Sequence, residues 1–157
     1  MSARFVSTPI SLANLDAGFQ RADLVFAGLD HSGPSYEVRI FFNQPDATAG
    51  TPRTPEQGYV RSFYLFGHGG CAGDVGHCEV PVSRRPYDFR PPHQLTPATR
   101  WVTVTDAVRH ALAAGPELTV TAVPVAAVPV AASGGPARPE EGADLMAVQH
   151  VSLVTYD

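Results

Sequence analysis

The chain has 157 residues and a mass of 16.7 kDa, which suits one domain built on a single core. Hydrophobic residues make up 44% of the sequence and charged residues only 17%, while 14 glycines and 15 prolines favour a loop-rich β fold. The net charge of -4, with no basic cluster beyond Arg84 and Arg85, argues against a nucleic-acid partner.

The sequence also argues against membrane insertion. Its first residues, MSARFVSTPISLANLD, lack the charged start, apolar run and small-residue cleavage site of a secretion signal. The most apolar stretch, VTAVPVAAVPVAA at 120–132, is interrupted by Pro124 and Pro129 and is too short to span a bilayer. We therefore expect a soluble, cytoplasmic protein with no membrane partner, and export together with another protein is the alternative.

Alternating hydrophobic residues predict strands in the first half of the chain. Segments 23–27 and 35–43 are rich in β-branched and aromatic residues, and the HSGP turn at 31–34 lies between them. Residues 44–58 contain prolines and glycines among small polar residues, which is typical of a surface loop. A further strand is predicted at 59–67.

The clearest local pattern in the second half is a strand followed by a short helix. Residues 101–104 complete the strand, and residues 107–114 form about two helical turns that Gly115 ends. Further strands are predicted from Leu118 and from Leu145 to the end of the chain. Trp101 is expected to lie in the core rather than to form a binding platform.

These elements predict an all-β fold, an antiparallel β-sandwich or barrel of six to seven strands with one short helix. We expect residues 1–157 to form a single β-domain, with an N-terminal arm at 1–21 and the β-domain proper at 22–157.

Both cysteines lie in the segment GHGGCAGDVGHC at 67–78. His68, Cys71, His77 and Cys78 supply the four soft or borderline ligands that a closed zinc or copper site needs, and Asp74 could add a fifth or orient an imidazole. Their spacing is not that of a common zinc finger or ribbon.

A disulfide between Cys71 and Cys78 is the competing interpretation, with the glycines allowing a tight loop and the histidines facing solvent. The glycines are not a phosphate-binding loop, because the lysine and the strand-loop-helix context are missing. Sequence motifs of hydrolases are also missing. The sequence thus favours a protein that is not an enzyme.

Several stretches, in this order, resemble the C-terminal β-domain of type-3 copper proteins, which include plant polyphenol oxidases, tyrosinases and molluscan haemocyanins. SYEVRIFFN at 35–43 is similar to the plant K-F-D-V-x-V-N signature, although its lysine is missing. The other matching stretches are SFYLFGHGG, EVP at 79–81, WVTVTDAVRHAL and ELTVTAVPV, and the resemblance covers about residues 22–156.

The resemblance implies an accessory domain without its oxidase. A type-3 centre holds two coppers with three histidines each, commonly in H-x3-H pairs, and the six histidines of this chain form no such pair. In the family this domain covers the copper cleft and can place a side chain in the substrate position. By resemblance, that side chain would be Leu65 or Phe66, and the adjacent cysteine-histidine segment could transfer copper to the oxidase.

We therefore expect a non-catalytic accessory domain whose partner is a separate copper oxidase and which shields it or helps to load its copper. One alternative is a stand-alone metal-binding protein or small metalloenzyme that binds copper or zinc through His68, Cys71, His77 and Cys78. A β-domain that serves assembly alone is the other alternative.

Overall fold

The computed structural model describes residues 4–67, 87, 96–126 and 145–157. Within these ranges the chain forms nine strands, one α-helix and one 3-10 turn. In chain order they are β1 (Phe5–Val6), β2 (Ile10–Ser11), β3 (Arg21–Leu29), β4 (Tyr36–Phe42), η1 (Pro55–Gln57), β5 (Tyr59–Leu65), β6 (Ala98–Thr103), α1 (Thr105–Ala114), β7 (Glu117–Leu118), β8 (Val120–Ala126) and β9 (His150–Tyr156).

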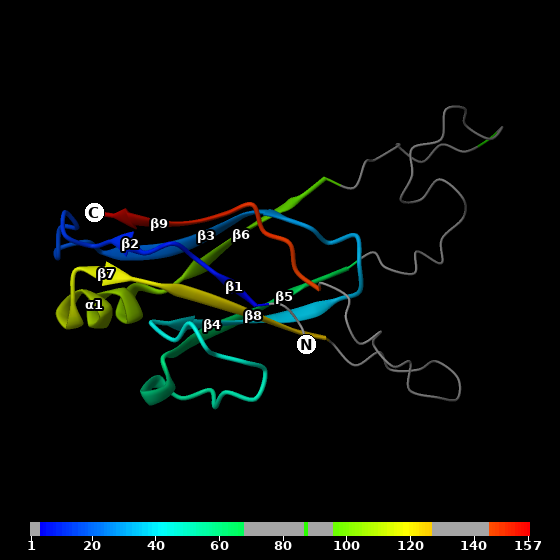
Figure 1. The fold of residues 1–157 in the computed structure, drawn as a ribbon. Coiled ribbons are helices and arrows are strands. Elements are labelled where there is room, and N and C mark those ends of the chain that lie inside the picture. Colours follow the sequence, from blue (N-terminus) through cyan, green and yellow to red (C-terminus); the bar gives the residue numbers. More distant parts are fainter. Residues whose placement is uncertain (1–3, 68–86, 88–95, 127–144) are drawn as a thin grey trace.

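Two antiparallel sheets face each other and enclose the core (Figure 1). One has the strand order β1-β8-β4-β5 and the other β6-β3-β9, while β2 and β7 form a separate short pair. Helix α1 lies at one end of the two sheets (Figure 1). The all-β prediction is therefore confirmed, and its sandwich alternative is the correct one.

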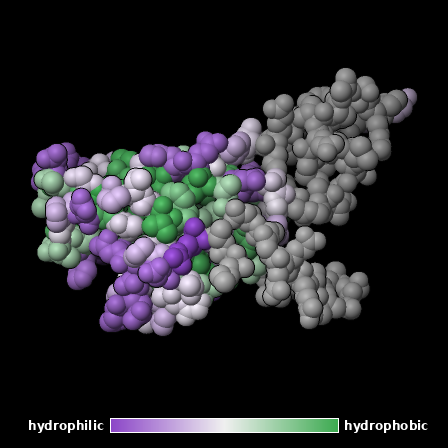
Figure 2. All heavy atoms as spheres, viewed as in Figure 1, coloured by the Kyte–Doolittle hydropathy of each residue, from purple (hydrophilic) through white to green (hydrophobic). Residues whose placement is uncertain are grey.

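The core lies between the inner faces of the two sheets. On β4, Tyr36, Val38 and Ile40 are each at most 1% exposed and point into this layer. On β3, Phe26 stacks against Phe63 of β5 with ring centroids 5.2 Å apart, which joins the two sheets. Figure 2 shows hydrophobic residues gathered between the sheets, as burial of apolar surface requires.

The outer face of the four-stranded sheet is also covered. Residues 43–58 fold back over it, where Ala47 packs with Phe41 and Val123 in a second buried cluster. Consequently β4 is buried on both faces, although Glu37 and Arg39 give its first half the alternation of a strand with one face in solvent. The covering loop presents a mainly hydrophilic surface (Figure 2).

The first 21 residues, expected to be an N-terminal arm, contribute to the sheets and to the core. Strand β1 pairs with β8, and β2 pairs with β7. Leu12 and Phe19 are buried in the main core cluster. Burial of these two side chains attaches the segment to the sandwich.

Trp101 was expected in the core, and this prediction is wrong. The residue is 57% exposed on β6 and is paired in register with Val25. Because successive strand residues point to opposite faces, burial of Val102 directs Trp101 outward. An aromatic side chain on an edge strand does not by itself reveal which face is buried.

The turn predicted at 31–34 connects β3 and β4, which belong to different sheets and do not pair. The last strand begins at His150, the register partner of Ala27, rather than at Leu145. The next residue of β3, Gly28, has a left-handed φ of 69°, and the register of β3 with β6 shifts there.

None of the helices in the described ranges is long and apolar enough to cross a membrane.

Candidate functional site

The end of the sandwich opposite α1 is where the cysteine-bearing segment joins the described structure. Strands β5 and β8 both flank β4 and both reach this end, because Leu65 and Ala126 are the two register partners of Tyr36. β6 and β9 begin at the same end, opposite Leu29 and Ala27 of β3. Figure 1 shows the ends of β5 and β8 and the beginnings of β6 and β9 on this side.

The two residues expected to contact a partner have different environments here. Leu65 is 1% exposed and belongs to the core, so its side chain is not available to another protein in this fold. Phe66, the next residue, is 74% exposed. Tyr64, one residue before Leu65, is 69% exposed. Alternation along β5 thus presents Tyr64 and Phe66 outward on either side of a buried leucine.

Gly67 fixes the direction in which the chain leaves β5. Its backbone N–H donates to the Ser35 hydroxyl at 3.0 Å. A Cβ atom at position 67 would overlap the backbone of Gly33 and Pro34, so only glycine fits this close approach. The position of Phe66 is therefore set on both sides, by buried Leu65 and by the packed backbone of Gly67.

The same turn also holds the chain where it returns toward β6. His31 Nε2 lies 2.7 Å from the Thr96 carbonyl oxygen, to which an N–H at that position donates. Within the turn, the Asp30 carboxylate accepts a hydrogen bond from the Ser32 N–H at 2.9 Å. This bond and a second one from the Ser32 hydroxyl lower the pKa of Asp30. Residues 30–35 therefore hold both flanks of the segment between Gly67 and Thr96.

Tyr36 supports this turn from inside. Its hydroxyl donates to the Asp30 carbonyl oxygen at 3.1 Å, and burial raises the pKa of Tyr36 to about 12. The phenol therefore stays protonated and able to donate this bond throughout the neutral range. The tyrosine of the SYEVRIFFN signature thus links the core to the end of the sandwich.

The predicted metal ligands lie outside the described residues; they are His68, Cys71, Asp74, His77 and Cys78. Within the described ranges no group of three histidine, cysteine, aspartate or glutamate side chains is placed to hold a metal ion. Of the remaining histidines, His110 and His150 are exposed, on α1 and at the start of β9. The metal-site prediction therefore stays a prediction.

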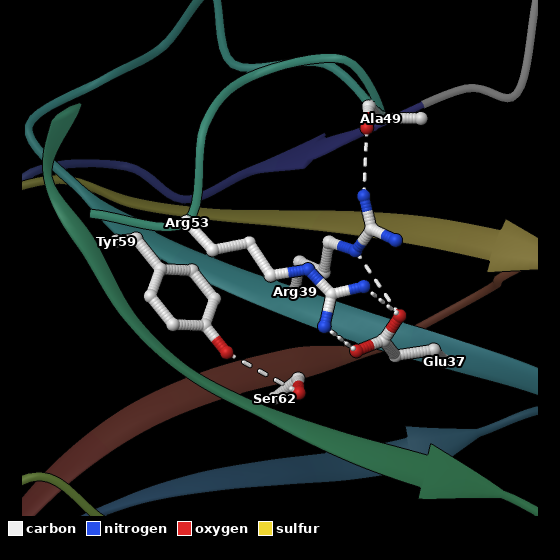
Figure 3. A network of polar contacts seen from close by, with 6 residues as sticks. All are labelled: Glu37, Arg39, Ala49, Arg53, Tyr59 and Ser62. Atoms are coloured by element: carbon white, nitrogen blue, oxygen red, sulfur yellow. Dashed lines mark hydrogen bonds and ion pairs between the residues drawn. The ribbon is translucent and has the colours of Figure 1, made fainter.

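A buried carboxylate with two arginines lies on the outer face of the four-stranded sheet (Figure 3). The Glu37 side chain is 8% exposed. Arg53 donates to both of its oxygens at 2.9 Å, and Arg39 donates to one at 3.1 Å. Arg39 also donates to the Ala49 carbonyl oxygen at 2.7 Å. The network fastens the loop that carries Ala49 and Arg53 onto β4.

Electrostatics keep this carboxylate charged. Burial alone would raise the pKa of Glu37, but hydrogen bonds from Ser62 and Arg39 and the positive charges of Arg39 and Arg53 outweigh it and lower the pKa. Sequence reasoning identified the strand that contains Glu37 and Arg39. It missed Arg53, because a single arginine 16 positions away in a proline-rich loop gives no local signal of this contact.

No family model matches the chain, and no curated protein matches it. Solved structures do match. Recombinantly expressed latent aurone synthase, a polyphenol oxidase, aligns with a TM-score of 0.53 and 14% identity over 99% of this chain and 25% of its own. Latent aurone synthase from a natural source gives a TM-score of 0.53 and 14% identity over 98% and 24%.

The chain thus spans about a quarter of the length of the polyphenol oxidases that it matches. At this identity the match concerns the fold. Nearly the whole chain has the fold of one portion of a latent polyphenol oxidase.

Proposed function

We propose that this chain is a non-catalytic accessory β-domain that shields a separate type-3 copper oxidase of the tyrosinase kind or helps to load its copper. The observation that carries the proposal is the alignment of 99% of the chain with a quarter of a polyphenol oxidase that is described as latent. The chain has the fold of one part of such an enzyme, and its six histidines lack the H-x3-H pairs of a type-3 centre.

The shielding role rests on Phe66. An exposed aromatic side chain next to a buried anchor is suited to enter a pocket of another protein, since aromatic anchors dominate many interfaces. Buried Leu65 and the close packing of Gly67 fix the base of this side chain, which lowers the entropy lost on binding. A stable complex of this kind buries roughly 1,200–2,000 Å² in total.

The copper-loading role rests on the sequence of the adjoining segment. His68, Cys71, His77 and Cys78 follow Phe66 within twelve positions and offer imidazole and thiolate ligands that suit copper. If loading occurs, co-expression with this chain raises the copper content of the oxidase, and serine at both cysteine positions removes the effect. Disulfide formation between Cys71 and Cys78 in every preparation would contradict this role, and free-thiol counting with elemental analysis distinguishes the two.

The shielding role predicts that a tyrosinase-type oxidase is encoded beside this chain, and it is tested with that oxidase after purification. We expect the chain to bind it at micromolar concentration and to lower its rate of phenol oxidation. Phe66→Ala should weaken the inhibition without lowering the melting temperature. Trp101→Ala, which removes another exposed aromatic from the other sheet, is the matched control and should inhibit like the wild type.

Failure of the purified pair to associate at micromolar concentration would contradict the proposal. Equal inhibition by wild type and Phe66→Ala would show that Phe66 does not contribute to shielding. One tightly held metal per isolated chain, with no effect on any oxidase, would favour the alternative of a stand-alone metal-binding protein.

A further inference from the structure

A groove runs between α1 and the chain around η1, at the end of the sandwich opposite Phe66. It has a volume of about 480 Å³, within the range of small-molecule sites. Residues of α1 form one wall of the groove, and residues between Pro55 and Val60 form the other. Phe42 and Asn43, at the end of β4, contribute to the groove between them. The seven residues of β4 separate the groove from the end that carries Phe66.

Backbone contacts hold the walls of this groove in place. Phe42 N–H donates to the Gly58 carbonyl oxygen at 2.8 Å, beside a register shift in the β4–β5 ladder. Asn43, with a left-handed φ of 53°, exchanges two 2.9 Å hydrogen bonds with Thr119 through its backbone N–H and its side-chain oxygen. Irregular backbone of this kind is frequent beside binding sites, and here it gives a preformed groove.

The lining combines apolar surface with negative charge. Phe42, Val60 and Ala111 contribute apolar atoms. Glu56 belongs to the wall formed by residues between Pro55 and Val60, and Asp106 belongs to the wall formed by α1. The described residues that line the groove include two carboxylates, Glu56 and Asp106, and one imidazole, His110, but no arginine or lysine, so acidic groups outnumber basic ones. A cation on an apolar body therefore complements both features of the lining.

Both carboxylates are accessible from the groove. The pKa of Glu56 is lowered, because its carboxylate accepts bonds from its own backbone N–H and from the Thr54 hydroxyl. Asp106 is contacted by Arg109 only at 3.5 Å, and Arg109 also donates to the Phe19 carbonyl oxygen at 2.9 Å. Arg109 is not part of the lining, so it leaves the groove side of Asp106 accessible.

From this combination we infer that the groove binds a small organic cation, a primary amine carried on an apolar body. The apolar body lies against Phe42, Val60 and Ala111, and the ammonium group lies between the carboxylates of Glu56 and Asp106. This site does not depend on the proposed shielding function, since the two lie at opposite ends of β4.

The probe for this inference is 2-phenylethylamine, titrated into the ¹⁵N-labelled full chain and followed by amide chemical shifts. We expect saturable shifts confined to residues 42–44, 55–60 and 106–114. The matched neutral probe 2-phenylethanol and the anionic probe 3-phenylpropionate should bind at least about fivefold more weakly, because only the amine gains from both carboxylates. Raising sodium chloride to roughly 0.5 M should weaken amine binding.

Two variants complete the test. Glu56→Gln combined with Asp106→Asn should reduce amine affinity about fivefold and leave the binding of 2-phenylethanol unchanged. Ala114→Trp, at an exposed position of α1 that lines the groove, should abolish binding of both by filling it. Asp157→Asn removes an exposed carboxylate outside the lining and serves as the control.

Equal affinity for the three probes, shifts outside the groove, or full amine binding by the double variant would each overturn the inference. A thermal melt of every variant shows whether it is folded. If Ala114→Trp does not fold, the double variant and the three probes still decide the question.

Discussion

Arg53 is the residue on which we base the most specific prediction. Its guanidinium makes two 2.9 Å hydrogen bonds to Glu37, whose side chain is 8% exposed, and so fastens the covering loop to the sheet. Arg53→Met keeps the aliphatic part of the side chain and removes the charge and the donors. Glu37 then stays buried with Arg39 as its remaining cation.

The size of the effect follows from these contacts. Removing one partner of a fully buried ion pair costs about 3–5 kcal/mol. The Arg53 side chain is 45% exposed and Arg39 remains, so we expect a smaller loss of about 2 kcal/mol in the free energy of unfolding. For a chain of this length the loss corresponds to a fall in melting temperature of about 4–8 °C.

Chemical denaturation of wild type and variant measures this difference. Arg4→Met is a matched control, because Arg4 binds Asp46 of the same loop at 2.9 Å while the Asp46 side chain is 92% exposed. An exposed pair contributes little, so this variant should lose less than about 0.5 kcal/mol. If Arg53→Met and Arg4→Met lose the same small amount, the Glu37 network does not hold the loop.

Three further predictions concern the signature strand and the end that carries Phe66. Gly67→Ala should lower the free energy of unfolding by about 2 kcal/mol, because the added methyl group meets the backbone of Gly33 and Pro34. Gly33→Ala is the control and should be within about 0.5 kcal/mol of wild type, because the space around its Cβ position is open. Leu65→Ala should lose about 2–5 kcal/mol and Phe66→Ala less than about 0.5 kcal/mol, so equal losses in urea denaturation would contradict their assignment to core and surface. Because folding lowers the pKa of Glu37, its charged form stabilises the folded protein above the ordinary pKa of 4.5. The stability advantage of wild type over Glu37→Gln should therefore be complete at neutral pH and decline as the pH falls below that value. An advantage that grew on acidification would contradict this sign.

Local patterns in the sequence determined the longer strands and where the helix lies, but not the two-residue strands β1 and β2. The strand predicted at 35–43, which alternates from Tyr36 to Ile40, contains β4 (Tyr36–Phe42), and the helix expected at 107–114 spans Thr105–Ala114. Both signals are local, since a strand repeats every two residues and a helix ends where glycine and proline follow it. The all-β class follows from the same patterns.

Tertiary structure alone decided which faces are covered and which distant residues meet. Trp101 is a large aromatic residue of the kind expected in a core, but its neighbour Val102 points inward, so Trp101 points into solvent. Leu65 and Phe66 are adjacent and similarly hydrophobic, yet one is buried and the other is exposed. Contacts across the fold set these differences, and a local window does not contain them.

Some features of the candidate site are visible in the sequence, and others are visible only in the tertiary structure. Its chemistry-bearing residues, two cysteines and two histidines among glycines, are visible in the sequence and suggest metal or a disulfide. That Ser35 and His31 hold Gly67 and Thr96 is visible only in three dimensions, because these partners are 32 and 65 positions apart. The pairing of Arg53 with Glu37 likewise depends on a loop folding back over a sheet, which brings together residues 16 positions apart. Burial of Glu37 makes the loss of this partner costly.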